Sequence, residues 1–454
     1  MNILFTTSAA PEKSPFFTNE KRPPLGLGFL ISLVRNEGHR IFFIDNYLEP
    51  SNFIKEGYLQ KNMIDYVAIH ANTICYRDTL KMFSEIENLR EKGLWKGKII
   101  VGGPHTSVAL STIPEFVDYV VQGEGERAIS KVVNGEARGR VLMEDRIRNL
   151  DSLPFQPWDI FSSLPYDYTC PWLEVMPVFT MNTSRGCPFN CTFCSVSSIW
   201  GKRCTYLSAD RIIAEIEYLV KNFGVKGIYF REDNFTLNSK RIEEFCEKLI
   251  KKHINITWAC ETRVDNISKE LVELMSAAGC KAFYFGVESG SQTILDMINK
   301  QITVEQIENA INWCKRYGVR SYCSLITGLP GETYEDYLLT KKLMEKLKPY
   351  AHVFNIFVAI PDSSLYKYIL NNKLYEYIDD VGLLYPPGYD IKTKYFYGRD
   401  NECFVDHPFN QRTTFDKQLM KELNRPKFIK TLAKLKDSVF KDVILKTRKI
   451  RAKS

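Results

Sequence analysis

The stretch RGCPFNCTFC at residues 185–194 holds three cysteines, Cys187, Cys191 and Cys194, spaced by four residues and then by three. It follows directly on a predicted strand at 178–182. Thiolates at this density suit an iron–sulfur cluster, because each iron takes soft sulfur ligands. Three thiolates in a cluster of four irons leave one iron open to a further ligand. A structural zinc site is disfavoured, because it needs four closed ligands and no histidine lies near.

The same period of strand and helix continues beyond this loop. Predicted strands alternate with predicted helices at 210–222, 239–252, 269–278, 304–317 and 334–347. Six such repeats predict a partial (β/α)6 TIM-like barrel over residues 177–370, with active-site groups at the carboxyl ends of the strands. The expected strands are 178–182, 227–230, 256–260, 281–287, 320–326 and 352–359.

Residues 1–140 also alternate between short apolar strands and helices. This pattern predicts an α/β domain with a doubly wound parallel, Rossmann-like sheet, whose ligands bind at the carboxyl ends of the strands. Glycine-rich turns fall at two of those ends. Residues 141–176 contain several prolines and read as an extended linker. Residues 371–454 form the last expected unit, a small and mostly helical extension.

Composition and charge exclude several classes of protein. The 454 residues are 44% hydrophobic and 25% charged, which is typical of folded domains. The longest apolar stretch has 10 residues, at 25–34, whereas a membrane span needs about 20. No secretory signal is visible at the N-terminus, so we expect a cytoplasmic protein whose twelve cysteines are reduced.

The net charge of +7 is concentrated at the C-terminus. Residues 425–454 carry 11 Lys or Arg and 2 Asp, so the rest of the chain is slightly acidic and no nucleic-acid partner is expected. Apolar residues in this tail recur at three- and four-residue steps. Two interpretations stay open: a basic amphipathic helix that contacts an anionic membrane surface, or a final helix that packs on the barrel.

The cysteine spacing, the aromatic residue before the last cysteine and the position after the first barrel strand together resemble the radical S-adenosylmethionine (SAM) superfamily. The resemblance implies a [4Fe–4S] cluster held by Cys187, Cys191 and Cys194, with SAM chelated by the open iron. One electron, from a reductant such as flavodoxin or ferredoxin, would cleave SAM to methionine and a 5′-deoxyadenosyl radical.

Residues after the later barrel strands resemble the SAM-contacting positions of this superfamily. Relatives more often have Asp-Asp-x-Phe where this chain has Glu232, so the second acid of the pair is the better candidate for the ammonium group. The resemblance thus implies Asp233 for the ammonium, Arg263 for the carboxylate, Glu288 or Ser289 for the ribose, and Gly328 in the turn near the adenine.

The N-terminal domain resembles the cobalamin-binding domain that precedes the barrel in one class of radical SAM enzymes. One motif is missing: the loop after the first strand has no Asp-x-His-x-x-Gly, and His70 lies on another loop. The relatives usually lack it too, which implies cobalamin bound without a protein histidine. The alternative is a doubly wound domain that binds no cobalamin. The expected cobalamin contacts are Thr73, Gly102, Gly103, His105 and Gly123.

The combined resemblance implies a cobalamin-dependent radical SAM methyltransferase. One SAM would methylate cob(I)alamin, and a second would yield the radical that abstracts hydrogen from an unactivated carbon. The substrate class stays open between a small molecule, a lipid and a peptide. Two alternatives remain: a radical SAM enzyme of another reaction type, such as a cyclase or rearrangement catalyst, with or without cobalamin, and a non-catalytic corrinoid or iron–sulfur carrier.

Overall fold

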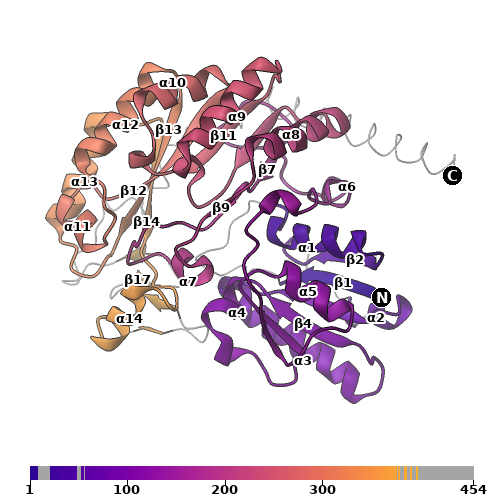
Figure 1. Cartoon of the computed structure of the whole chain (residues 1–454). Coiled ribbons are helices and arrows are strands. Elements are labelled where there is room, and N and C mark those ends of the chain that lie inside the picture. Colours follow the sequence, from indigo (N-terminus) through magenta and orange to yellow (C-terminus); the bar gives the residue numbers. More distant parts are fainter. Residues whose placement is uncertain are drawn as a thin grey trace, which may run out of the picture.

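The computed structural model describes residues 1–8, 21–48, 53–55, 57–375, 377–378, 383–385, 389–390 and 395–396. Two six-stranded parallel sheets dominate it, one in each half of the chain (Figure 1). The predicted tail at 425–454 and most of the predicted extension at 371–454 lie outside the described residues. Among the described helices, none has the length and apolar character of a membrane span.

The N-terminal sheet has the strand order β2-β1-β3-β4-β5-β6, and every neighbouring pair is parallel. The order reverses between β1 and β3, as expected for a doubly wound sheet. One strand, β6, was not predicted. It has three residues at the start of the expected linker, too few for a periodic pattern. The strands are β1 (Asn2–Thr7), β2 (Arg40–Asp45), β3 (Tyr66–His70), β4 (Lys98–Gly102), β5 (Tyr119–Gln122) and β6 (Val141–Met143).

Helices cover both faces of this sheet, because its strands are apolar on both sides. Apolar residues of α1 and α5, such as Ile31 and Ile129, pack on Phe5 of β1. On the other face, α3 packs Phe83 against Leu4. The helices are α1 (Leu25–Asn36), α2 (Tyr58–Lys61), α3 (Tyr76–Glu91), α4 (Pro104–Val108) and α5 (Glu126–Val133).

The second sheet has the order β14-β13-β12-β11-β10-β7, so each strand pairs with its predecessor in the parallel repeat. All six predicted strands form. They are β7 (Val178–Met181), β10 (Gly227–Phe230), β11 (Thr257–Thr262), β12 (Cys280–Glu288), β13 (Arg320–Thr327) and β14 (Ala351–Ile356).

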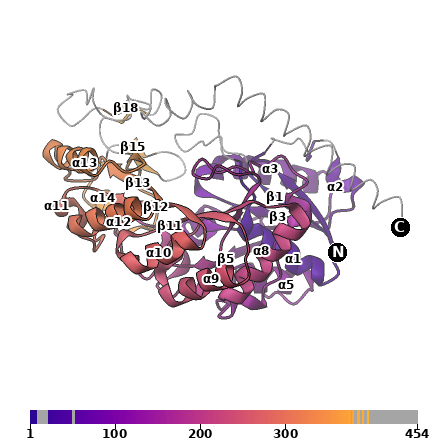
Figure 2. The same ribbon diagram turned by 90° about the horizontal axis from the view of Figure 1, so that it is seen from above.

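The helices between these strands lie along one side of the curved sheet (Figure 2). The opposite side is closed at the amino ends of the strands by Trp172, whose ring contacts those of Tyr229, Tyr284 and Tyr322. The carboxyl ends are therefore the open end of the barrel. The helices are α8 (Ala209–Phe223), α9 (Ser239–Lys251), α10 (Lys269–Ala277), α12 (Val304–Arg316) and α13 (Tyr334–Leu347).

The segment predicted as a linker packs firmly between the two halves. Its helix α6 (Trp158–Phe161) places Trp158 in one apolar cluster with Phe29 of α1 and Phe179 of β7. The indole Nε1 donates to Glu215 Oε1 of α8 at 2.8 Å. The two halves therefore share a continuous core.

Short elements complete the described chain. Helix α7 lies between the two halves in Figure 1, next to α4. The other elements are single-turn or longer helices and two-residue strand pairs. They are α7 (Val196–Trp200), α11 (Gln292–Met297), α14 (Ser364–Asn371), β8 (Ser184–Arg185) with β9 (Thr205–Tyr206), β15 (Tyr377–Ile378) with β16 (Leu384–Tyr385), and β17 (Tyr389–Asp390) with β18 (Tyr395–Phe396).

Candidate functional site

The three cysteines of the 185–194 stretch lie on one loop between β8 and α7, and all three are half-buried. Backbone contacts from distant parts of the barrel hold this loop. Thr192 N donates to Ile298 O at 2.9 Å, and its carbonyl accepts from Leu365 N at 2.8 Å. The loop is therefore fixed from two sides, by the end of α11 and the start of α14.

The thiols fit a cluster better than a single ion. Within the described residues, no three His, Cys, Asp or Glu side chains converge closely enough to hold one metal ion. A cubane does not require such convergence, because each thiolate binds a different iron. Burial raises the pKa of Cys187, and it raises that of Cys194 to about 12. Binding of iron therefore has to release protons from these thiols.

Two acids follow β10 next to the loop. Glu232 is buried and accepts from Thr183 N at 3.1 Å, from Thr183 Oγ1 and from Ser184 Oγ. Asp233 accepts from Gly186 N at 3.2 Å, and burial raises its pKa to about 6. Both acids line the cavity described below, but Glu232 already accepts three hydrogen bonds from residues 183 and 184, whereas Asp233 accepts one from the cysteine loop. The role of Asp233 as the partner of the SAM ammonium stays a prediction.

Arg263, expected at the SAM carboxylate, already has several partners. Its guanidinium pairs with Asp265 at 2.9 and 3.0 Å and lies 3.6 Å from the centroid of the Phe189 ring. Its Nη1 approaches Cys191 Sγ at 3.6 Å, and its Nη2 donates to Lys300 O at 2.7 Å. In this structure Arg263 anchors the cysteine loop, and its pairing with SAM stays a prediction.

The remaining SAM candidates are also bonded within the barrel. Glu288 pairs with Lys300 Nζ at 2.7 Å, which connects it through the Lys300 backbone to Arg263. Ser289 is fully buried, with its hydroxyl 3.1 Å from Thr340 Oγ1. Gly328 accepts from Tyr375 OH at 2.9 Å, and its N–H donates to Glu332. The structure brings Asp233 and Arg263 against the cysteine loop. Glu288 is connected to Arg263 only through Lys300, and Ser289 is enclosed against α13.

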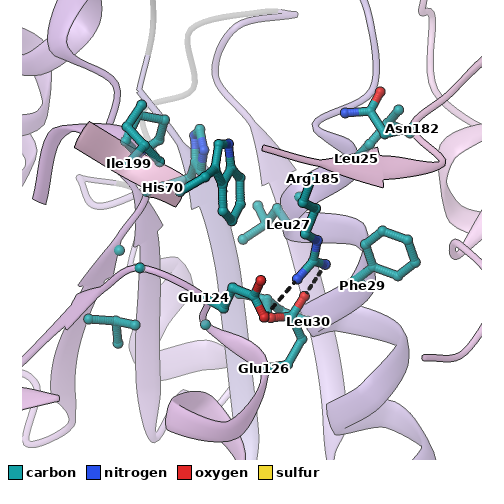
Figure 3. A pocket seen from close by; sticks show the side chains of 18 of the residues that line it. Leu25, Leu27, Phe29, Leu30, His70, Glu124, Glu126, Asn182, Arg185 and Ile199 are labelled. Atoms are coloured by element: carbon teal, nitrogen blue, oxygen red, sulfur yellow. Dashed lines mark hydrogen bonds and ion pairs between the residues drawn. The ribbon is translucent and has the colours of Figure 1, made fainter. Parts of the chain in front are cut away.

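A cavity of about 440 Å³ lies between the carboxyl ends of the two sheets. The N-terminal half contributes His70, Gly102 and Gly123 at the ends of β3, β4 and β5. The barrel contributes Asn182 and Asp233 from the ends of β7 and β10. Figure 3 shows the labelled side chains from both halves around it. This is the edge at which both fold types bind ligands.

The glycines of the N-terminal half suit a bulky ligand here. A Cβ on Gly26 or Gly123 would meet no atom within 4 Å, so open space lies over both. At Gly103, φ is +114° and a Cβ would lie 2.6 Å from Ala71 O, so the turn requires glycine. The cavity thus offers a backbone cradle of the kind expected for the cobalamin tail.

Thr73 and His105, two of the expected cobalamin contacts, are buried and do not line the cavity. His105 is fully buried, lies 3.1 Å from Thr73 Oγ1 through Nδ1 and 2.9 Å from Thr112 Oγ1 through Nε2, and stacks on Tyr76. Burial lowers its pKa to about 4. His105 therefore supports the loop above β4 and does not line the cavity. Sequence spacing alone does not show which way this ring turns.

A buried ion network, absent from the sequence analysis, joins the two halves at the floor of the cavity. Arg185 pairs with Glu124 at 3.3 Å and with Glu126, drawn as dashed lines in Figure 3. Arg146 also pairs with Glu124, at 3.1 Å, and donates to the Trp200 carbonyl at 2.8 Å. Glu124 is 2% exposed and Arg185 10% exposed at their side chains. The turn 123–126 is thus bonded to Arg185, which precedes Cys187 by two positions.

Comparison with known proteins separates the same two halves. Residues 181–344 match the radical SAM superfamily, and residues 19–133 match the B12 binding domain. The chain is 33% identical over 375 residues to "Uncharacterized methyltransferase PH0819" of Pyrococcus horikoshii. This match covers 78% of this chain and 79% of the relative. The chain belongs to the radical SAM enzymes with a cobalamin-binding domain. Its cofactors are accordingly a [4Fe–4S] cluster, SAM and cobalamin, as predicted.

Other proteins similar to this radical SAM chain include a cyclase and a solved cobalamin-dependent enzyme. An anaerobic magnesium-protoporphyrin IX monomethyl ester cyclase of Rubrivivax gelatinosus is 26% identical over 71% of the chain, which spans 64% of the cyclase. The cobalamin-dependent SAM radical enzyme OxsB, solved with aqua-cobalamin and SAM, shares the fold with a TM-score of 0.72 and 19% identity. That match covers 96% of this chain and 70% of OxsB.

A solved methyltransferase also shares the fold. TsrM from Kitasatospora setae, with cobalamin and a [4Fe–4S] cluster bound, has a TM-score of 0.61 at 15% identity, over 78% of this chain and 72% of TsrM. These two structures confirm the predicted α/β architecture, in which a Rossmann-like sheet precedes a partial barrel.

Proposed function

We propose that this chain is a cobalamin-dependent radical SAM methyltransferase that methylates an unactivated carbon of a small-molecule, lipid or peptide substrate. The observation that carries the proposal is the cavity shared by both sheets, which borders the cysteine loop through Asp233 and the glycine cradle through Gly123. When bound, the cluster supplies the electron that cleaves SAM, and cobalamin carries the methyl group.

The residues of the chain would provide binding and orientation. Cys187, Cys191 and Cys194 would hold the cluster, and Arg263 would fix the loop through Cys191 and Phe189. Asp233 would accept hydrogen bonds from the SAM ammonium, which favours its ionised form. Glu288 would face the ribose, and the turn at Gly328 the adenine. Gly102, Gly103 and Gly123 would receive the cobalamin tail. We assign the cobalamin-binding unit to residues 1–140 and the barrel to 177–370.

The surroundings of the reaction follow from the same chemistry. The enzyme would need a one-electron reductant, such as flavodoxin or ferredoxin. The eleven cysteines of the described part of the chain are free thiols. A protein with so many reduced cysteines fits the cytoplasm, a reducing compartment.

A cyclase or other radical reaction is the second candidate, favoured by the 26% identity to the magnesium-protoporphyrin cyclase. The experiment that separates the two starts from protein purified without oxygen after growth with cobalamin. Iron and cobalt are quantified, and the protein is incubated with methyl-labelled SAM and a low-potential reductant. The methyltransferase predicts stoichiometric cobalt, release of 5′-deoxyadenosine and label on the corrinoid.

Other outcomes of this experiment decide against the proposal. Iron without cobalt, or label that never leaves SAM while 5′-deoxyadenosine forms, would favour the cyclase type of reaction. SAM that stays uncleaved under strong reductant would favour a non-catalytic carrier.

A further inference from the structure

His70 lies where the strand order of the N-terminal sheet reverses. It is the last residue of β3, and its register partner across the sheet is Thr7, the last residue of β1. The strand order reverses between these two strands, so His70 lies at the topological switch point. The loop after β1, which carries no histidine, begins beside it.

The His70 ring is available to a ligand. It is half-buried and lines the cavity, where Figure 3 shows it beside Ile199. It makes no hydrogen bond to any described residue. On one side it rests against the Gly103 turn, since a Cβ there would lie 3.1 Å from His70 Cδ2.

Burial favours the neutral form of this imidazole. Burial lowers the pKa of His70 below its ordinary value, although the charge of Asp45 acts in the opposite direction. Asp45 itself is engaged with Thr7 Oγ1 and Tyr166 OH. Neutral imidazole is the form that binds transition metals.

The other histidines of the described residues lack these properties. His105 is enclosed by two threonines, and His39 is half-buried, lies outside the cavity lining and bonds to Asn134. His253 and His352 lie in the barrel half and do not line the cavity. Of the histidines that the structure describes, His70 is therefore the one that faces the shared cavity.

We propose that the imidazole of His70 ligates the cobalt of bound cobalamin. This assignment differs from our sequence-based expectation of cobalamin without a protein histidine. It rests on cobalamin binding by the family and not on methyl transfer.

The test uses the full chain, loaded with cobalamin and reduced to the cob(II)alamin state. The protein is labelled with ¹⁵N-histidine, the cobalamin is unlabelled, and an electron paramagnetic resonance spectrum is recorded without substrate. An axial ¹⁴N ligand splits each cobalt line into a triplet, whereas ¹⁵N gives a doublet. We expect the triplet of unlabelled protein to become a doublet, which the cofactor's own base cannot produce.

A variant and a control sharpen the assignment. H70Q should lose the nitrogen splitting and retain its iron, whereas H39Q should keep the doublet. Two results would overturn the proposal and leave methyl transfer untouched. In both, cobalt is bound, but its lines show either no nitrogen splitting or the same triplet in labelled and unlabelled protein. Protein that binds no cobalt would overturn both proposals together. Because the labelling experiment uses the natural sequence, it stays decisive if H70Q fails to fold.

Discussion

The two sheets have the same number of strands and the same parallel pairing, yet they place ligands differently. In the N-terminal sheet the strand order reverses between β1 and β3, so helices cover both faces and a crevice opens at the switch point. In the barrel sheet the order follows the chain, so successive crossovers put the helices on one side. There the ligand-binding residues gather at the open end, around the cysteine loop.

The comparison teaches that neither sheet encloses the cavity alone. Gly123 and His70 come from one sheet, and Asn182 and Asp233 from the other. The Arg185–Glu124–Glu126 network holds the two carboxyl edges face to face. Changes in one sheet should therefore affect its own cofactor, whereas changes in the network should affect both.

The largest effect is expected from Cys187→Ala, which removes a cluster ligand from the barrel sheet. Formation of 5′-deoxyadenosine should become undetectable, while cobalt content stays at the level of the natural protein. Cys204→Ala is the matched control, because Cys204 is a half-buried thiol nearby outside the motif. Retained SAM cleavage in the first variant would contradict the cluster assignment.

Breaking the connection between the sheets should have the largest effect on folding. Arg185→Met leaves Glu126 buried without its cation, while Glu124 keeps Arg146. Removing one partner of a buried ion pair costs about 3–5 kcal/mol in the free energy of unfolding. Denaturant titration of both proteins measures this loss in the free energy of unfolding. Arg35→Met is the control, because its pair with Asp159 is exposed by 39% and 60% and contributes less than about 1 kcal/mol. Equal losses in the two variants would show that the buried network does not hold the halves together.

A smaller effect should be confined to the N-terminal sheet. Gly103→Ala forces a side chain into a left-handed conformation against Ala71 O, at a cost of about 1–3 kcal/mol. Cobalt content should fall while iron stays. In contrast, Gly26→Ala should raise helix stability by about 0.5–1 kcal/mol, since α1 gains a better helix former. It should still weaken cobalamin binding if the ligand fills that space. Unchanged cobalt in both variants would place cobalamin elsewhere.

The smallest effect concerns pH at the Gly328 turn. Burial raises the pKa of Glu332 to about 7, although backbone N–H groups of Gly328 and Leu329 favour the ionised form. The folded state therefore binds this proton more tightly than the unfolded state, and stability should fall as pH rises from about 4 to 7. Glu332→Gln should remove this slope, whereas exposed Glu335→Gln should keep it. A slope of opposite sign in the natural protein would contradict the assignment.

The regular parts of the fold were predictable because their signals are local. Helix 334–347 and strand 227–230 have the predicted bounds, since a periodic apolar pattern and a capping residue such as Thr333 define them. Strand β6 was missed because three residues carry no period. The segment 141–176 was predicted as a linker from its prolines, but Trp158 makes it part of the common core.

The candidate site was predictable only in part. Spacing singled out the three cysteines as cluster ligands, and comparison with the family pattern Asp-Asp-x-Phe favoured Asp233 over Glu232. Both assignments stay predictions. The direction of His105 was not predictable, because Thr73 and Thr112 reach it from separate segments. The same holds for Arg263, whose partners Asp265, Cys191 and the Lys300 carbonyl meet only in the folded barrel.

By itself, the sequence determined the two parallel sheets through their periodicity and the cluster cysteines through their spacing. The resemblance that these motifs carry then implied the family, SAM and cobalamin. Only the tertiary structure decided which residues face the shared cavity and which support it from behind. The physical reason is that buried charge and hydrogen-bonding groups must find partners, and those partners come from whichever segment the fold brings near. Arg185, two residues from the first cluster cysteine, finds its partners in the cobalamin half, at Glu124 and Glu126.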